Sequence, residues 1–123
     1  MITLIIDAAK DKVFFKIIND YKSYTNEFSN SRENFDKFTS LLFNFLKKNN
    51  VNVSKINNIL VNQGPGKSSG IKASIAVVKA LSITNQLNLY GFKSHQLKNN
   101  QYDEIFELFV KGKLKKNLIK LNY

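Results

Sequence analysis

The segment between residues 56 and 92 constrains the fold of this chain more than any other. An apolar run at 56–61 precedes a loop at 62–70 that contains three glycines and a proline. A helix-like segment at 71–86 and a second apolar run at 87–92 follow. Strand, loop, helix and strand make a βαβ unit, in which the two strands are parallel and the crossover is right-handed. The sequence therefore predicts a sheet with a parallel pair, covered by a helix.

Two further strands are predicted at the start of the chain. Residues 2–6 and 13–18 are rich in β-branched and aromatic side chains, and the polar residues 7–12 between them are typical of a hairpin turn. Both runs are apolar on both faces, which indicates strands that are covered on both sides. The mixed residues at 21–28 fit a third, exposed strand. A hairpin that leads into a βαβ unit predicts an α/β domain with a mixed sheet.

Two predicted helices carry a large apolar surface. Residues 31–50 form the first, with Ser31 as the expected N-cap, and its apolar arc exceeds the roughly 100° that covers a sheet. The second, at 71–86, is apolar almost all the way round. We expect the excess surface to contact another protein, although pattern alone equally allows another element of this chain to cover the first helix. The expected interface residues are Phe35, Phe38, Leu41, Leu42, Phe45, Ile71, Ile75 and Val78.

The glycine loop resembles a phosphate-binding loop in part. Gly66-Lys67-Ser68 matches the end of the motif G-x-x-x-x-G-K-[ST], but Val61 stands where that motif has its first glycine. We therefore discount a nucleotide hydrolase and favour a structural turn, with Ser68 or Ser69 as the cap of the following helix. Anion binding at the helix N-terminus is the alternative. The expected structural residues are Gly64, Pro65, Gly66 and Gly70.

Catalytic and metal-binding constellations are not visible. The chain has no cysteine and a single histidine, His95, so the sequence predicts neither a zinc site nor a Ser-His-Asp triad. Asp7 stands at a strand end, where turn and cap roles are the commoner ones for aspartate. We expect no catalytic residue, no metal ligand and no cofactor.

The net positive charge has two possible explanations, nucleic-acid binding or a compositional bias. The formal net charge is +10, which would attract phosphates. Lysine, asparagine, isoleucine and phenylalanine are all abundant, as in an AT-rich coding sequence, and Arg32 is the single arginine. We expect the Lys-rich end of the chain to be solvated or to face a partner. No apolar run reaches the roughly 20 residues of a membrane span, so we expect a cytoplasmic protein.

Three segments, in the same order, resemble the TsaB (YeaZ) family. Residues 1–7 resemble its opening strand "ILAIDTS", residues 59–72 its "xxVGxGPGSFTGxR" loop and helix start, and residues 89–94 its "PLVGVSS" strand. Residues 73–81 fit the helix between the last two segments. Lys72 stands for the usual arginine, and Asp7-Ala8-Ala9 replaces "DTS". The resemblance covers residues 1–94.

The resemblance implies an ASKHA-type, ribonuclease-H-like fold for residues 1–94. Residues 95–123 stand in place of the family's second domain, and apolar residues at helical spacing over 102–110 predict a helix in this Lys-rich tail. It implies a noncatalytic scaffold that binds and activates a TsaD-type catalytic subunit in tRNA threonylcarbamoyladenosine modification. A TsaE-type ATPase is a further expected partner, self-pairing into a homodimer is a second expectation, and tRNA is contacted indirectly. The "HxxxH" metal motif of the catalytic paralogue has no counterpart here. A basic tRNA- or nucleic-acid-binding module that uses the Lys-rich tail is the alternative function.

Overall fold

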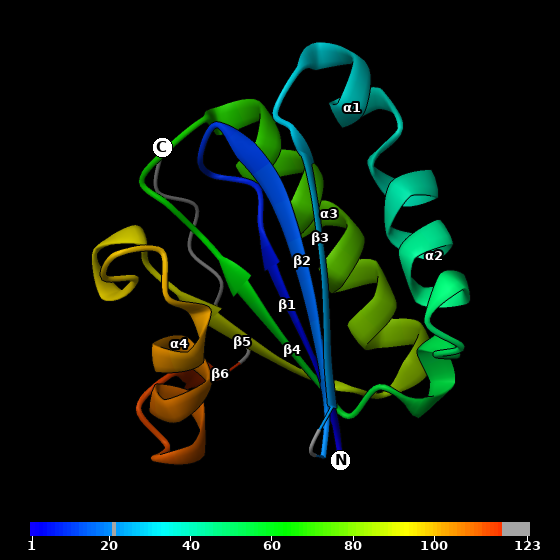
Figure 1. Ribbon diagram of the computed structural model, residues 1–123, viewed down its shortest axis with the longest axis vertical. Helices are drawn as coiled ribbons and strands as arrows, with labels where there is room; N and C mark the ends of the chain where they lie inside the picture. The colour runs from blue at the N-terminus through cyan, green and yellow to red at the C-terminus, as the bar shows by residue number, and fades with distance from the viewer. Residues whose placement is uncertain (21, 117–123) are drawn as a thin grey trace.

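The computed structural model describes residues 1–20 and 22–116 and has a six-stranded mixed sheet with helices on both faces (Figure 1). The strand order is β3-β2-β1-β4-β5-β6. The strands are β1 (Ile2–Asp7), β2 (Lys12–Asn19), β3 (Lys22–Ser29), β4 (Asn58–Asn62), β5 (Asn88–Phe92) and β6 (Lys115–Lys116). The α-helices are α1 (Arg32–Asp36), α2 (Phe38–Lys48), α3 (Ser68–Asn85) and α4 (Tyr102–Val110). Two short 3₁₀ turns are η1 (Val53–Lys55) and η2 (Ser94–Gln96).

The sheet confirms the predicted α/β class and its mixed topology. β1, β2 and β3 pair antiparallel in sequence order, as the predicted hairpin and third strand require. β4 lies parallel to β1 on one side and to β5 on the other, so the predicted βαβ unit is present with α3 as its crossover. β6 is the last strand in this order and pairs antiparallel with β5.

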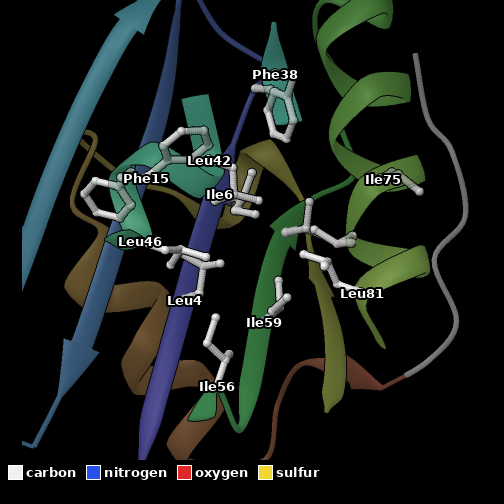
Figure 2. Packing of buried hydrophobic residues seen from close by; sticks show 14 of the residues in the cluster. Leu4, Ile6, Phe15, Phe38, Leu42, Leu46, Ile56, Ile59, Ile75 and Leu81 are labelled. Atoms are coloured by element: carbon white, nitrogen blue, oxygen red, sulfur yellow. The ribbon is translucent and has the colours of Figure 1, made fainter. Parts of the chain in front are cut away.

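The larger core lies between the sheet and the helices α2 and α3. Figure 2 shows Phe38, Leu42 and Leu46 from α2 and Leu81 from α3 directed toward the sheet. Ile75 of α3 belongs to the same cluster. Every second residue of a strand faces the same side, so alternate apolar residues of the strands meet these helices. The sheet residues in this cluster include Leu4, Ile6, Val13, Phe15, Ile17, Ile59, Val61 and Leu89.

A smaller core lies on the opposite face of the sheet, where α4 packs (Figure 1). Its buried residues are Ile5, Leu60, Phe92, Leu97, Ile105 and Leu114. Residues 95–116, expected as a tail, thus pack against the same sheet and contribute β6 to it. The predicted helix at 102–110 is confirmed as α4. The boundary at residue 94 stays a prediction, and the last part of the tail, residues 117–123, lies outside the described residues, as does Tyr21.

Two predictions about the helices are corrected. The segment expected as one helix at 31–50 forms two, because the chain turns at Lys37 (φ −107°, ψ 13°) and α1 then contacts α3 separately from α2. Ser31 does cap α1, since its Oγ accepts a hydrogen bond from the Asn34 backbone N–H at 3.3 Å. α3 begins at Ser68, with Lys67 at the N-cap and no side-chain cap. The serines expected as caps therefore lie in the first helical turn.

We expect Phe15→Ala to reduce the free energy of unfolding by about 3–5 kcal/mol, the usual cost of deleting a buried aromatic ring. Phe15 is fully buried, and its ring lies 5.6 Å from the rings of both Phe38 and Phe45. Phe43→Ala is the matched control, because Phe43 is 40% exposed, and it should cost less than about 1 kcal/mol. Urea unfolding of both variants measures the difference, and equal losses would contradict the described core.

Candidate functional site

The glycine loop is held between the ends of two parallel strands. The Asn62 Oδ1 at the end of β4 accepts a hydrogen bond from the Gly64 N–H at 2.8 Å. On the β5 side, the Ser94 N–H donates to the Gly64 carbonyl at 3.1 Å, and the Ser94 hydroxyl donates to the Pro65 carbonyl at 2.7 Å. Gly64 has φ +100°, a conformation that L side chains rarely adopt, as expected for the turn. These bonds tie the loop to both strands of the βαβ unit.

The rest of the loop lies against the backbone that follows β1. A Cβ added at Gly66 would lie 2.2 Å from the Ala9 carbonyl oxygen, and one added at Gly70 would lie 2.0 Å from the Ala8 carbonyl oxygen. The Lys67 N–H donates to the Ala9 carbonyl at 2.9 Å. In a phosphate-binding loop such an N–H points at the ligand, whereas here it is bonded to the protein itself. The glycines therefore bring two stretches of backbone into direct contact.

A buried polar network lies at the same end of the sheet, centred on Asp7. Asp7 is fully buried at the end of β1. Its Oδ1 accepts from the Ala9 N–H at 3.0 Å and from the Asn62 Nδ2 at 3.1 Å, and its Oδ2 accepts from the Tyr102 hydroxyl at 2.8 Å. The bond from Ala9 is the turn-forming role expected for a strand-end aspartate. Donors from three separate segments thus satisfy this buried carboxyl group.

Tyr102 connects this network to α4. Its ring stacks on Phe14 of β2, with the ring centroids 3.9 Å apart and the planes within 10° of parallel. Next to it, Lys16 Nζ forms an ion pair with Asp103 Oδ1 at 2.7 Å. Burial raises the pKa of Tyr102 well above its ordinary value, and the Asp7 charge and hydrogen bond raise it further. Tyr102 therefore stays protonated and donates to Asp7 up to strongly alkaline pH.

The side chains of this cluster are suited to hold separate segments of the chain together. Both Asp7 oxygens accept hydrogen bonds from the chain itself. Across residues 1–20 and 22–116, no group of three or more His, Cys, Asp or Glu side chains is placed to hold a metal ion. Sequence reasoning noticed Asp7 but missed its partners Asn62 and Tyr102. It also missed Ser94, which is bonded to Asn62. The signal for Asn62 was present, because Asn62 ends β4 as Asp7 ends β1, and parallel strands end at one edge.

Most of the predicted interface residues lie inside the chain. Phe35 and Leu41 are half-buried, while the other six pack in the core between the helices and the sheet. These six are Phe38, Leu42, Phe45, Ile71, Ile75 and Val78. They face this chain's own sheet, so a substitution such as Phe38→Ala would test folding rather than assembly. The prediction that α2 and α3 contact another protein is not tested by this placement.

The outer face of α2 and α3 carries other apolar residues. Ile83 on α3 is 78% exposed, and Phe43 on α2 is 40% exposed. On the same side of α3 as Ile83, Ala76 and Ala80 are also exposed, and the half-buried Val77 of α3 packs against the edge of the core. We call these five residues the outer helix face. Among the helices that the structure describes, none has the length and apolar character needed to cross a bilayer.

We expect Gly70→Ala to destabilise the protein by about 1–3 kcal/mol, because the new methyl group would collide with the Ala8 carbonyl. The sign is diagnostic, since glycine to alanine in an unobstructed helix stabilises by about 1 kcal/mol. Ser69→Ala, at an exposed position of the same turn, should change stability by less than about 0.5 kcal/mol. Thermal and urea unfolding measure both variants, and a more stable Gly70→Ala protein would refute the close approach.

We expect Tyr102→Phe to cost about 1–3 kcal/mol, because the buried Asp7 loses one of its donors. The Tyr102 hydroxyl contributes its full stabilisation below about pH 10, the ordinary tyrosine pKa. This stabilisation is lost as the pH rises above that value, because Tyr102 loses its hydroxyl proton in the unfolded chain before it does so in the folded one. Urea unfolding at several pH values should therefore show the two proteins converging at alkaline pH. A difference that is constant or that grows with pH would contradict the role of the hydroxyl.

Comparison with known proteins identifies the fold. No protein-family model and no curated protein sequence matches the chain. Among solved structures, YeaZ from Pseudomonas aeruginosa superposes with a TM-score of 0.74 at 18% identity, over 85% of this chain and 50% of YeaZ. A structure described as an uncharacterized protein with similarity to peptidase YEAZ from Pseudomonas aeruginosa gives the same TM-score, 0.74, at 18% identity, over 84% of this chain and 48% of that one.

A second group of structures shares the fold more distantly. RuvC from Thermus thermophilus, in complex with a Holliday junction substrate, superposes with a TM-score of 0.55 at 12% identity, over 99% of this chain and 83% of RuvC. The present chain spans about half the length of the YeaZ structures. The ribonuclease-H-like, ASKHA-type fold expected from the resemblance is confirmed, and the chain has the fold of about one half of YeaZ.

Proposed function

We propose that this chain is a TsaB-type (YeaZ-type) partner subunit that carries no catalytic residues of its own. In this proposal it binds and activates a TsaD-type catalytic subunit in tRNA threonylcarbamoyladenosine modification. The cytoplasm is its location, a TsaE-type ATPase is a further member of the assembly, and tRNA is reached through the catalytic partner. The YeaZ fold and the three sequence segments that resemble the TsaB family support this assignment.

The observation that carries the proposal is the outer helix face. An exposed apolar patch marks a protein contact. Ala76, Ala80 and Ile83 lie on one side of α3 at helical spacing, next to the exposed Lys72 and Lys79. Here Ile83 is the most exposed large apolar residue of the described chain, and small alanines lie beside it. Small side chains let a second helix approach closely. The resemblance to the TsaB family implies that the same helices form the dimer interface.

The polar network supports the noncatalytic part of the proposal. A carboxyl group that acts on a substrate needs an oxygen free to reach it. Asp7 is fully buried and accepts three hydrogen bonds from the chain itself. In the glycine loop, the Lys67 N–H is likewise bonded to the Ala9 carbonyl rather than directed at a phosphate. Both features favour a structural role for Asp7 and the glycine loop rather than a catalytic one.

We expect Ile83→Asp to weaken binding to the TsaD-type subunit of the same cell by at least about tenfold, which equals about 1.4 kcal/mol, because a charge would be buried in an apolar contact. Val110→Asp is the matched control. Val110 is 64% exposed on α4, on the opposite face of the sheet, so its variant should bind normally. Isothermal titration of the purified pair measures both affinities, and circular dichroism verifies that both variants are folded.

Three outcomes would contradict the proposal. The first is the absence of a complex between the wild-type chain and the TsaD-type subunit. The second is equal binding by both variants, which would place the contact elsewhere. The third is self-pairing that Ile83→Asp abolishes while no TsaD-type subunit binds, which would make the outer helix face a homodimer surface.

A further inference from the structure

We infer that a lysine-lined hollow beside β5 and β6 binds the phosphate backbone of a nucleic acid. The hollow has a volume of about 330 Å³ and lies where β5 ends and β6 pairs with it. Its lining residues are Gln63, Gly91, Lys93, His95, Gln96, Lys113 and Lys115. Three cationic side chains, from the end of β5 and from the strand and loop after α4, thus surround one concave surface. This inference does not depend on the proposed partner function.

The charge of the hollow is not balanced by nearby acids. No carboxylate is among its described lining residues. The recorded ion pairs join six other cations to acids elsewhere, for example Lys16 to Asp103 and Lys111 to Glu107. In residues 1–20 and 22–116, no ion pair is recorded for Lys93, Lys113 or Lys115. Three lysines around a hollow without counter-charges create a local positive potential that attracts anions.

The backbone geometry keeps these lysines together. β6 pairs antiparallel with β5, and Lys115 lies opposite Gly91 in the register. Gly91 has no side chain, and the Gln63 amide occupies the adjacent space, since an added Cβ would lie 2.9 Å from Gln63 Nε2. The floor of the hollow is therefore made of backbone and a buried amide, and the lysines form its rim. Lys115 lies on a paired strand, and Lys93 and Lys113 lie within two residues of the ends of these strands, so the backbone holds the three positions together before any ligand arrives.

The surface fits a nucleic-acid backbone better than a membrane. Binding to a bilayer surface uses a wide face with large apolar side chains that enter the lipid. No large apolar side chain and no Phe, Tyr or Trp is among the lining residues that the structure describes. His95 is the one ring among these described residues that could stack on a base, and such stacking tolerates any base. The hollow should therefore contact phosphates and be nearly independent of base sequence.

The test measures the salt dependence of binding to a fluorescein-labelled RNA hairpin by fluorescence anisotropy. The variant carries Lys93→Gln, Lys113→Gln and Lys115→Gln. The control carries Lys22→Gln, Lys48→Gln and Lys55→Gln, which remove the same total charge from exposed positions on β3, the end of α2 and η1. β3 lies at the opposite end of the strand order from β6. Circular dichroism and thermal unfolding verify that both proteins are folded.

We expect the hollow variant to bind the hairpin at least tenfold more weakly at low salt. Each lysine that neutralises a phosphate contributes about 0.7–0.9 to the slope of log affinity against log salt concentration, so the slope should fall by about 2–3. The control should keep its slope and most of its affinity. A second hairpin of unrelated sequence should bind wild type with similar affinity, and inorganic phosphate should compete only at high concentration.

Several results would overturn the inference. Equal weakening of both triple variants would indicate a diffuse effect of net charge rather than a site. If the hollow variant binds the hairpin as tightly as wild type does, the binding site lies elsewhere. If wild type binds neither hairpin, a nucleic acid is not the ligand of the hollow. Tight binding of vesicles that contain anionic phospholipid, abolished by the same three substitutions while the hairpin binds weakly, would assign the hollow to a membrane surface instead.

Discussion

Two stretches of backbone meet where the first turn of α3 lies against the residues that follow β1. The contact exists because Gly66 and Gly70 have no side chains that would collide with the carbonyls of Ala9 and Ala8. It fixes the start of α3 over the end of β1, and the pairing of β4 with β1 fixes the strand that precedes the helix. The direction of α3 across the sheet follows from these two constraints.

The same contact decides which side of α3 is left for a partner. With its first turn fixed, α3 directs Ile71, Ile75 and Val78 into the core and leaves Ile83 exposed. On the other face of the sheet, Tyr102 attaches α4 to the buried Asp7. The molecule therefore has an apolar helical face on one side and, beyond β5, a lysine-lined hollow. We propose different partners for these two surfaces, a protein for the first and a nucleic acid for the second.

Much of the fold could be predicted because periodicity and turn chemistry agree along the chain. The βαβ unit followed from the apolar runs around the glycine loop, and the hairpin followed from the β-branched runs at the start. The contacts of single side chains could not be predicted in the same way. An apolar stripe such as that of Phe38 and Leu42 has the same pattern whether it faces its own sheet or another protein, and only the packing places it in the core.

The polar network and the lysine-lined hollow could not be predicted from the sequence for a different reason. Tyr102 reaches Asp7 across 95 residues, and Lys93 shares its hollow with Lys113 and Lys115, which stand about twenty positions further along the chain. Local sequence patterns carry no information about such separations. The helix at 102–110 was predicted from its apolar spacing, but the side of the sheet that it covers depends on the tertiary path of the chain.

We propose that the outer side of α3 is a protein-binding surface that the fold leaves uncovered. Hydrogen–deuterium exchange of the chain, alone and with an excess of the TsaD-type subunit, tests it most directly because it locates the contact without any substitution. The account predicts slower exchange in α2 and α3 on addition of the subunit, with α4 and β6 unchanged. Protection confined to α4 and β6, or no protection at all, would contradict it.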